Sequence, residues 1–115
     1  MGKKTDIFKK ERLSLNEIVL NYSEKNIKRF FSLDRQVYED GALPKKTKEL
    51  LGLVASIVLR CDDCIQYHLI ECFSIGVTSD EISEAISISL IVGGSITIPH
   101  IRRAFETWDE LVNNK

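Results

Sequence analysis

Two segments of this chain are apolar on almost every helical face, and this restricts the fold more than any other feature. Within the expected helix 45–60, Gly52 and Ser56 are the only breaks in the aliphatic run of residues 50–59, and residues 82–92 carry a second run. A helix that is hydrophobic all round must be buried on all sides. We therefore expect a second subunit to cover the excess and predict a homo-oligomer. The alternative is that both helices lie at the centre of a compact bundle.

The rest of the chain also indicates helices, because its two prolines leave long uninterrupted stretches and no strand-like alternation stands out. We predict an all-α bundle of about six helices. Four signals mark the expected helix boundaries. Gly41 is expected as a C-terminal cap, Pro44 at the start of a helix, Gly76 at the end of one and Thr78–Glu81 as a capping box. The expected helices cover residues 13–21, 23–40, 45–60, a cysteine-bearing segment ending at Gly76, a segment from Thr78 through Val92, and residues 98–111.

The length of 115 residues fits a single domain over residues 1–115, in which residues 1–12 are expected to form a flexible tail. The net charge of −1 lacks the basic footprint of a nucleic-acid-binding protein. The apolar stretches fall short of a membrane-spanning helix, and no apolar leader segment precedes Leu13. We therefore expect a cytoplasmic protein with neither nucleic acid nor membrane as partner. In that reducing compartment a close cysteine pair is more often catalytic or metal-binding than structural.

Cys61 and Cys64 form a C-x-x-C pair, and His68 follows one turn later. On a helix these residues and Cys72 fall within an arc of about 80°, so they share one face. The spacing lets the two sulfurs form a disulfide and places the imidazole beside Cys64. A thiolate is the nucleophile, and a neighbouring imidazole can accept the thiol proton. We interpret the pair as a thiol–disulfide redox centre and expect Cys72 to be an ordinary core residue.

The same residues allow other interpretations. Asp62 and Asp63 place negative charge beside the thiols and are expected to raise their pKa values, giving a milder redox pair. A zinc site or a non-enzymatic redox-sensing module would use the same cysteines and His68, although ligands on one helical face rarely complete a tetrahedron. Haem attachment requires a histidine directly after the second cysteine, where this chain has Ile65. An oligomeric scaffold with vestigial cysteines is the remaining alternative.

The spacing of the site residues resembles the redox branch of the carboxymuconolactone decarboxylase/alkylhydroperoxidase D-like superfamily, whose pattern is E-x11-C-x2-C-x3-H. Glu49 lies twelve residues before Cys61, and Cys64 and His68 follow at the intervals of the pattern. The resemblance extends over residues 45–108. Its further matches are the G-x-T-x-x-E-I segment Gly76–Ile82, the pair Gly93-Gly94 and the trailing His100.

This resemblance implies an all-helical fold, trimers or hexamers of such subunits, and reduction of hydroperoxides through a redox-active Cys61–Cys64 disulfide, with no other cofactor and no metal. It assigns Cys64 as the cysteine that attacks the peroxide and Cys61 as the resolving cysteine, with Glu49 and His68 as a proton relay. A thiol or lipoyl-type compound would donate the electrons. The decarboxylase branch lacks the cysteine pair, so decarboxylation is not expected, and a carboxymuconolactone decarboxylase-like enzyme is kept only as the alternative. His100 is expected either in the site or in packing.

Overall fold

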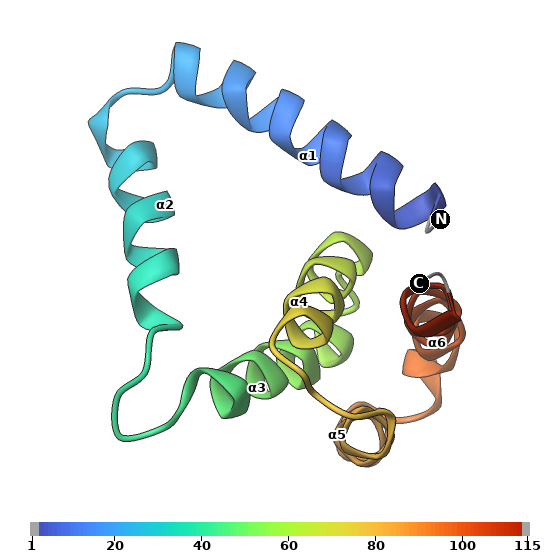
Figure 1. Ribbon diagram of the computed structural model, residues 1–115. Helices are drawn as coiled ribbons and strands as arrows, with labels where there is room; N and C mark the ends of the chain where they lie inside the picture. Colours follow the sequence, from blue (N-terminus) through green and yellow to red (C-terminus); the bar gives the residue numbers. More distant parts are fainter. Residues whose placement is uncertain (1–2, 114–115) are drawn as a thin grey trace.

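The computed structural model describes residues 3–113, and within this range the chain forms helices and no strand (Figure 1). The all-α expectation is therefore confirmed. A single 3-10 turn, η1, precedes the last helix. The elements are α1 (Lys3–Tyr22), α2 (Lys25–Val37), α3 (Lys45–Val58), α4 (Asp62–Ser74), α5 (Ser79–Gly93), η1 (Ser95–Thr97) and α6 (Ile98–Asn113).

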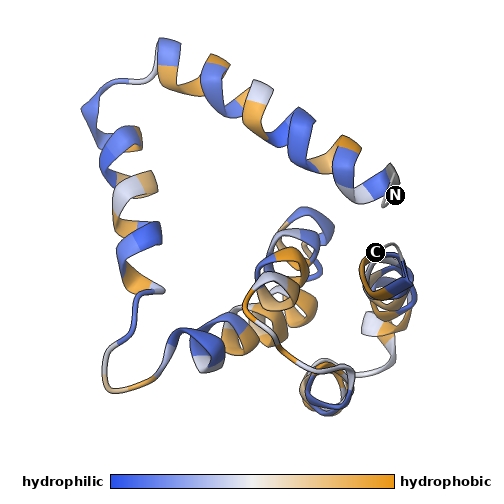
Figure 2. Ribbon diagram, viewed as in Figure 1, coloured by the Kyte–Doolittle hydropathy of each residue, from blue (hydrophilic) through white to orange (hydrophobic). Residues whose placement is uncertain are grey.

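The core is built by α3, α4, α5 and α6. Helix α3 packs against both α4 and α5, and α4 also packs against α6. Figure 2 shows long apolar stretches on α3, in contrast to the alternating colours of α1. The two strongly apolar segments of the sequence therefore supply core helices. The largest fully buried apolar side chains are Leu53, Ile57, Ile65, Leu69 and Ile82.

Local signals in the sequence set the ends of the core helices. Helix α5 begins at the predicted capping box. The Thr78 hydroxyl accepts a hydrogen bond from the Glu81 amide, and the Glu81 carboxylate accepts one from the Thr78 amide. Helix α4 ends in a Schellman arrangement around Gly76, whose φ of 86° suits a residue without Cβ. Gly94, the C-terminal cap of α5, also has a positive φ, of 82°, and its amide donates to the Leu90 carbonyl. The boundaries predicted at Gly76, Thr78 and the Gly93-Gly94 pair are confirmed.

The predicted N-terminal tail is wrong for residues 3–12, which form the first half of α1. Tertiary contacts hold this segment on α6. The Thr5 amide donates to the Glu110 carboxylate at 2.8 Å, and Lys4 pairs with Glu106 at 2.8 Å. Lys4 and Thr5 thus find acidic partners on a helix distant in sequence. Residues 1 and 2 of the predicted tail lie outside the described residues.

The predicted cap at Gly41 is also wrong, because α2 ends at Val37. Tyr38 is its C-terminal cap, and Gly41 lies in the following turn without a positive φ. The physical reason lies on α3: the Lys48 ammonium donates to the carbonyls of Val37 and Glu39 at 2.9 and 2.7 Å. A cation on these carbonyls ends the helix without a glycine.

Helices α1 and α2 form an arm that contacts the core through the first half of α1 and then bends away from it (Figure 1). Helix α2 contributes no buried residue, and the arm exposes many large apolar side chains. Apolar side chains are exposed on the outer faces of α3 and α5 as well, for example Leu51 and Ile91. The homo-oligomer predicted from the sequence remains a prediction. None of the described helices combines the length and the hydropathy needed to cross a membrane.

Candidate redox site

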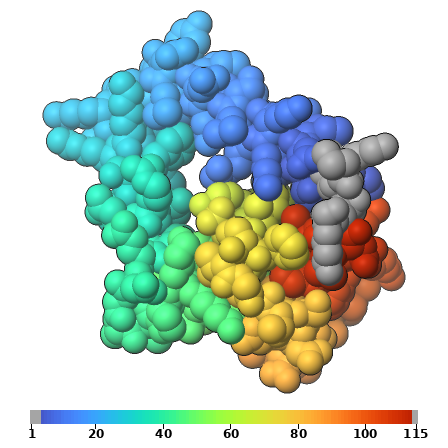
Figure 3. Space-filling model, in the orientation of Figure 1, coloured from blue at the N-terminus to red at the C-terminus, as the bar shows by residue number. Residues whose placement is uncertain are grey.

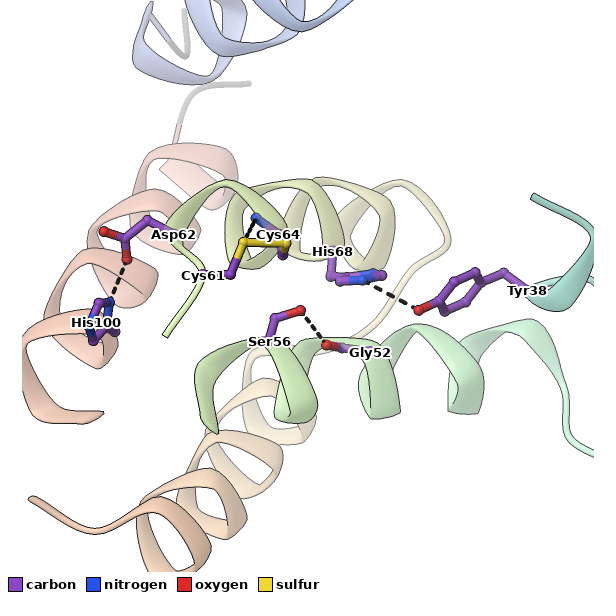
Figure 4. Close-up of a disulfide and its surroundings, with 8 residues drawn as sticks. All are labelled: Tyr38, Gly52, Ser56, Cys61, Asp62, Cys64, His68 and His100. Carbon is purple, nitrogen blue, oxygen red and sulfur yellow. Dashed lines mark hydrogen bonds and ion pairs between the residues drawn. A yellow bond between two sulfur atoms is a disulfide. The ribbon is translucent and has the colours of Figure 1, made fainter. Parts of the chain in front are cut away.

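Cys61 and Cys64 form a disulfide where the chain leaves α3 and enters α4 (Figure 4). Cys61 lies just before α4 as its N-terminal cap, in extended conformation, and the preceding Arg60 has φ of 60°. The Cys61 amide donates to the Ser56 carbonyl at 3.0 Å, which ties this turn to α3. The predicted helical projection is therefore wrong for Cys61, because the redox pair joins a turn to a helix. Cys64 is exposed, while Cys61 is half-buried.

The Cys61 sulfur lies at the positive end of α4. It accepts the backbone N–H of Cys64 at 3.2 Å, in the position of an N-terminal capping oxygen. A helix N-terminus stabilises negative charge, so the arrangement favours a thiolate on Cys61 when the disulfide is reduced.

Glu49 and His68 form a buried pair below the disulfide. Helix α3 supplies Glu49 and α4 supplies His68, whose Nδ1 lies 2.7 Å from a Glu49 carboxylate oxygen. The exposed fractions of the two residues are 1% and 8%. Lys45 approaches the other Glu49 oxygen at 3.6 Å from one helical turn earlier. The structure thus brings together two residues that lie 19 positions apart in the sequence.

Tyr38 and Gly52 complete the surroundings of His68, and neither was predicted as a site residue. The Tyr38 hydroxyl lies 3.5 Å from His68 Nε2, and the two rings are 5.3 Å apart between centroids. A Cβ at Gly52 would come within 2.8 Å of both His68 Nε2 and the Tyr38 hydroxyl, so only glycine leaves room for them (Figure 4). Burial, followed by the charge of Glu49, raises the pKa of Tyr38, which keeps its proton on the hydroxyl.

Asp62 points away from the sulfurs toward α6 (Figure 4). Its carboxylate contacts His100 Nδ1 at 2.8 Å and the Arg103 guanidinium at 3.0 Å. Burial acts to raise the Asp62 pKa, but the hydrogen bonds from His100 and Arg103 outweigh it, and the pKa is lowered. The negative charge of Asp62, which was expected to act on the thiols, is therefore paired with His100 and Arg103. His100 takes part in this pairing next to the cysteine turn.

We predict that this cluster makes Asp62 a source of stability that acid removes. Its pKa lies below the ordinary value of 3.8, so its stabilisation is complete above that value and is lost as the pH falls through the lower, folded-state pKa. In urea unfolding at neutral pH, Asp62→Asn should be less stable than the wild type, and the gap should close as the pH drops below 3.8.

Asp63→Asn is the matched control for this comparison. It removes a carboxylate from the same first turn of α4, and within residues 3–113 no ion pair joins Asp63 to α6. Its stability difference should not follow the pH dependence of Asp62→Asn. A difference in unfolding free energy between Asp62→Asn and the wild type that stays constant down to acidic pH would contradict the prediction.

A cavity of about 380 Å³ opens onto Cys64 and His68 from the side of the arm. Residues of α1, α2 and α4 line it, with Phe8, Leu15 and Tyr67 as its apolar wall. Figure 3 shows the hollow between the blue-to-cyan arm and the yellow surface of α4. The exposed sulfur of the pair is thus accessible to a small molecule through this cavity.

Cys72 is fully buried in the core and takes no part in the disulfide, as expected. Burial, followed by the nearby carboxylates, raises its thiol pKa to about 12, so it stays protonated and unreactive at neutral pH. The region from residue 3 to residue 113 contains no group of three or more His, Cys, Asp or Glu side chains arranged to hold a metal ion.

The all-helical fold agrees with the family comparison. The model of the carboxymuconolactone decarboxylase family matches residues 25–107, and the chain belongs to this family. An uncharacterised protein of the Paracoccus denitrificans cox locus is 32% identical over 71% of this chain and 74% of its own length. An uncharacterised Cupriavidus necator protein is 27% identical over 64% of this chain and 65% of its own length.

Solved structures of the family show the same fold. Two crystal structures from Thermotoga maritima are 58% and 57% identical and superpose with TM-scores of 0.89 and 0.87. Each covers 90% of this chain, matching 91% and 88% of the respective chains. The second is described as a family protein that is a candidate for a role in antioxidative response. A Legionella pneumophila family protein in its apo form is 25% identical, with a TM-score of 0.86 over 94% of this chain and 96% of its own.

Proposed function

We propose that this protein is a thiol–disulfide oxidoreductase that reduces hydroperoxides through Cys61 and Cys64. The observation that carries the proposal is the accessible disulfide at the start of α4, with a buried Glu49–His68 pair beneath it. A buried carboxylate that orients an imidazole next to a nucleophile is the arrangement used for proton transfer. The candidate antioxidative role of the Thermotoga maritima relative also supports this proposal.

In the proposed reaction the reduced Cys64 thiolate attacks the terminal oxygen of the hydroperoxide, the one that carries the hydrogen. The O–O bond breaks, the alcohol leaves with a proton, and Cys64 becomes a sulfenic acid. The Cys61 thiolate, held at the N-terminus of α4, then attacks the Cys64 sulfur as the disulfide forms, and the displaced hydroxide takes a proton from solvent and leaves as water. His68, held by Glu49, takes the Cys64 thiol proton and returns it to the leaving alcohol. A thiol or lipoyl-type donor restores both thiols.

A single-turnover experiment tests this function. The reduced protein is mixed with less than one equivalent of an organic hydroperoxide, and the reaction is quenched with an alkylating reagent. We expect one Cys61–Cys64 disulfide for each peroxide consumed, read by mass spectrometry of the two cysteines, with Cys72 unchanged. The matched control is protein alkylated before the peroxide is added. The proposal would be refuted if peroxide were consumed without loss of the two thiols, or if the reduced protein consumed no peroxide.

A further inference from the structure

Carboxylates from three helices line the cavity at the disulfide. Glu11 comes from α1, Asp34 from α2 and Asp63 from α4. The one arginine in the lining, Arg12, has its guanidinium 4.1 Å from the centre of the Tyr67 ring. Ordinary carboxyl and guanidinium groups are fully charged at neutral pH, so negative charge predominates around the opening to Cys64.

We propose that this cavity selects the reducing partner by charge: it admits thiols that are neutral or cationic near the sulfur and holds off anionic thiols. The inference rests on the proposed function, because a catalytic disulfide has to be reduced before each further turnover. It adds the chemical class of the donor and assigns Glu11 and Asp34 as the residues that determine it.

The reduction begins at Cys64, because its sulfur is exposed and lines the cavity, whereas Cys61 is half-buried and lies outside the lining. A donor thiolate attacks the Cys64 sulfur, the Cys61–Cys64 bond breaks, and Cys61 leaves as a thiolate beside the Cys64 amide. A second donor thiolate then attacks the donor sulfur of the mixed disulfide and releases the Cys64 thiolate. Two electrons pass to the protein, the protons of the donor thiols protonate its cysteines, and the donor leaves as its disulfide.

Charge matters at this step because the attacking group is itself negative. A further negative charge on the donor has to come within a Debye length, about 10 Å, of the carboxylates as its sulfur reaches Cys64. Low-dielectric walls focus the field in such a cavity, and fields of this kind change association rates by about 10-fold or more. A donor with an ammonium group is attracted by the same field.

The test measures how fast small thiols reduce the oxidised protein. Three probes differ in charge: cysteamine is cationic, 2-mercaptoethanol is neutral and 3-mercaptopropionate is anionic. Each rate is measured in the wild type and in the double variant Glu11→Gln/Asp34→Asn by alkylation quench and mass spectrometry. The ratio of the two rates for one thiol cancels the intrinsic reactivity of that thiol. We expect the variant to react about threefold or more faster with 3-mercaptopropionate and slower with cysteamine, with 2-mercaptoethanol nearly unchanged.

A second double variant, Glu17→Gln/Glu84→Gln, is the matched control. Both glutamates are exposed and lie outside the cavity, so this variant removes the same formal charge from other surfaces. It should keep the wild-type order of rates. Added salt should reproduce the effect in the wild type, accelerating 3-mercaptopropionate and slowing cysteamine. Equal changes for all three thiols, or the same changes in the control, would overturn the proposal.

No peroxide is present in this assay, so its outcome is independent of the peroxide step. Charge selection without peroxide consumption would support the inference and count against the proposed function. Peroxide consumption without charge selection would do the reverse.

Discussion

Replacing Cys64 with serine is expected to abolish thiol-dependent peroxide consumption, leaving a rate at least about 100-fold below the wild type. Serine has nearly the same size, but its hydroxyl does not ionise near neutral pH, so the variant keeps the fold and lacks the nucleophile. Cys61→Ser should behave differently, because it retains Cys64 and lacks the resolving thiol. It should consume one equivalent of peroxide and accumulate a sulfenic acid on Cys64, which a dimedone adduct reveals in mass spectrometry.

Cys72→Ala is the control for both cysteine variants, because it removes the third thiol from the core without touching the site. It should consume peroxide as the wild type does. Wild-type turnover in Cys64→Ser would contradict the mechanism. A sulfenic acid found on Cys61 in the Cys64→Ser variant would reverse the assigned order of the two cysteines.

The second large effect is expected at Glu49. Glu49→Gln keeps the shape of the side chain but removes the charge that faces His68 Nδ1 at 2.7 Å. Without this carboxylate the imidazole loses the charged partner that holds it in one orientation. We expect the reaction of Cys64 with peroxide to slow by about 100-fold, which is the lower range of general acid–base catalysis. Stopped-flow measurement of thiol loss across a range of pH checks both the rate and the shape of its pH dependence.

Glu84→Gln, on the exposed face of α5, is the control for the loss of one carboxylate. A purely structural role of Glu49 would lower the thermal stability of the variant and leave the pH profile of the surviving rate unchanged. A slowing of less than about threefold with an unaltered pH profile would therefore exclude Glu49 from the proton relay.

The core of the fold was predictable because its signals are local. The Thr78 capping box and the glycines at positions 76 and 94 act through neighbouring residues, and each specifies a helix end by itself. The start of α1 was not predictable, because Lys4 and Thr5 are held by carboxylates of α6 that lie about 100 positions away in the sequence. The end of α2 was missed for the same kind of reason, since Lys48 of the next helix caps it.

The site shows the same division. The spacing of Cys61, Cys64 and His68 suggested their proximity, but periodicity has no means of pairing Glu49 with His68 across two helices, and the family resemblance was needed for that pairing. Tyr38 and Gly52 had no detectable signal, because a tyrosine at a helix end and a glycine inside a helix acquire their roles only when α2, α3 and α4 meet. The pairing of Asp62 with α6 was hidden in the same way.

The position of Cys61 has a mechanical consequence. One sulfur of the pair is carried by a turn of extended backbone and the other by the first turn of α4. In the proposed cycle we therefore expect the bond to open and close by rotation of side chains and small adjustments of the turn, with the helices that carry Glu49 and His68 kept in place. Oxidation and reduction would then need no partial unfolding of the domain.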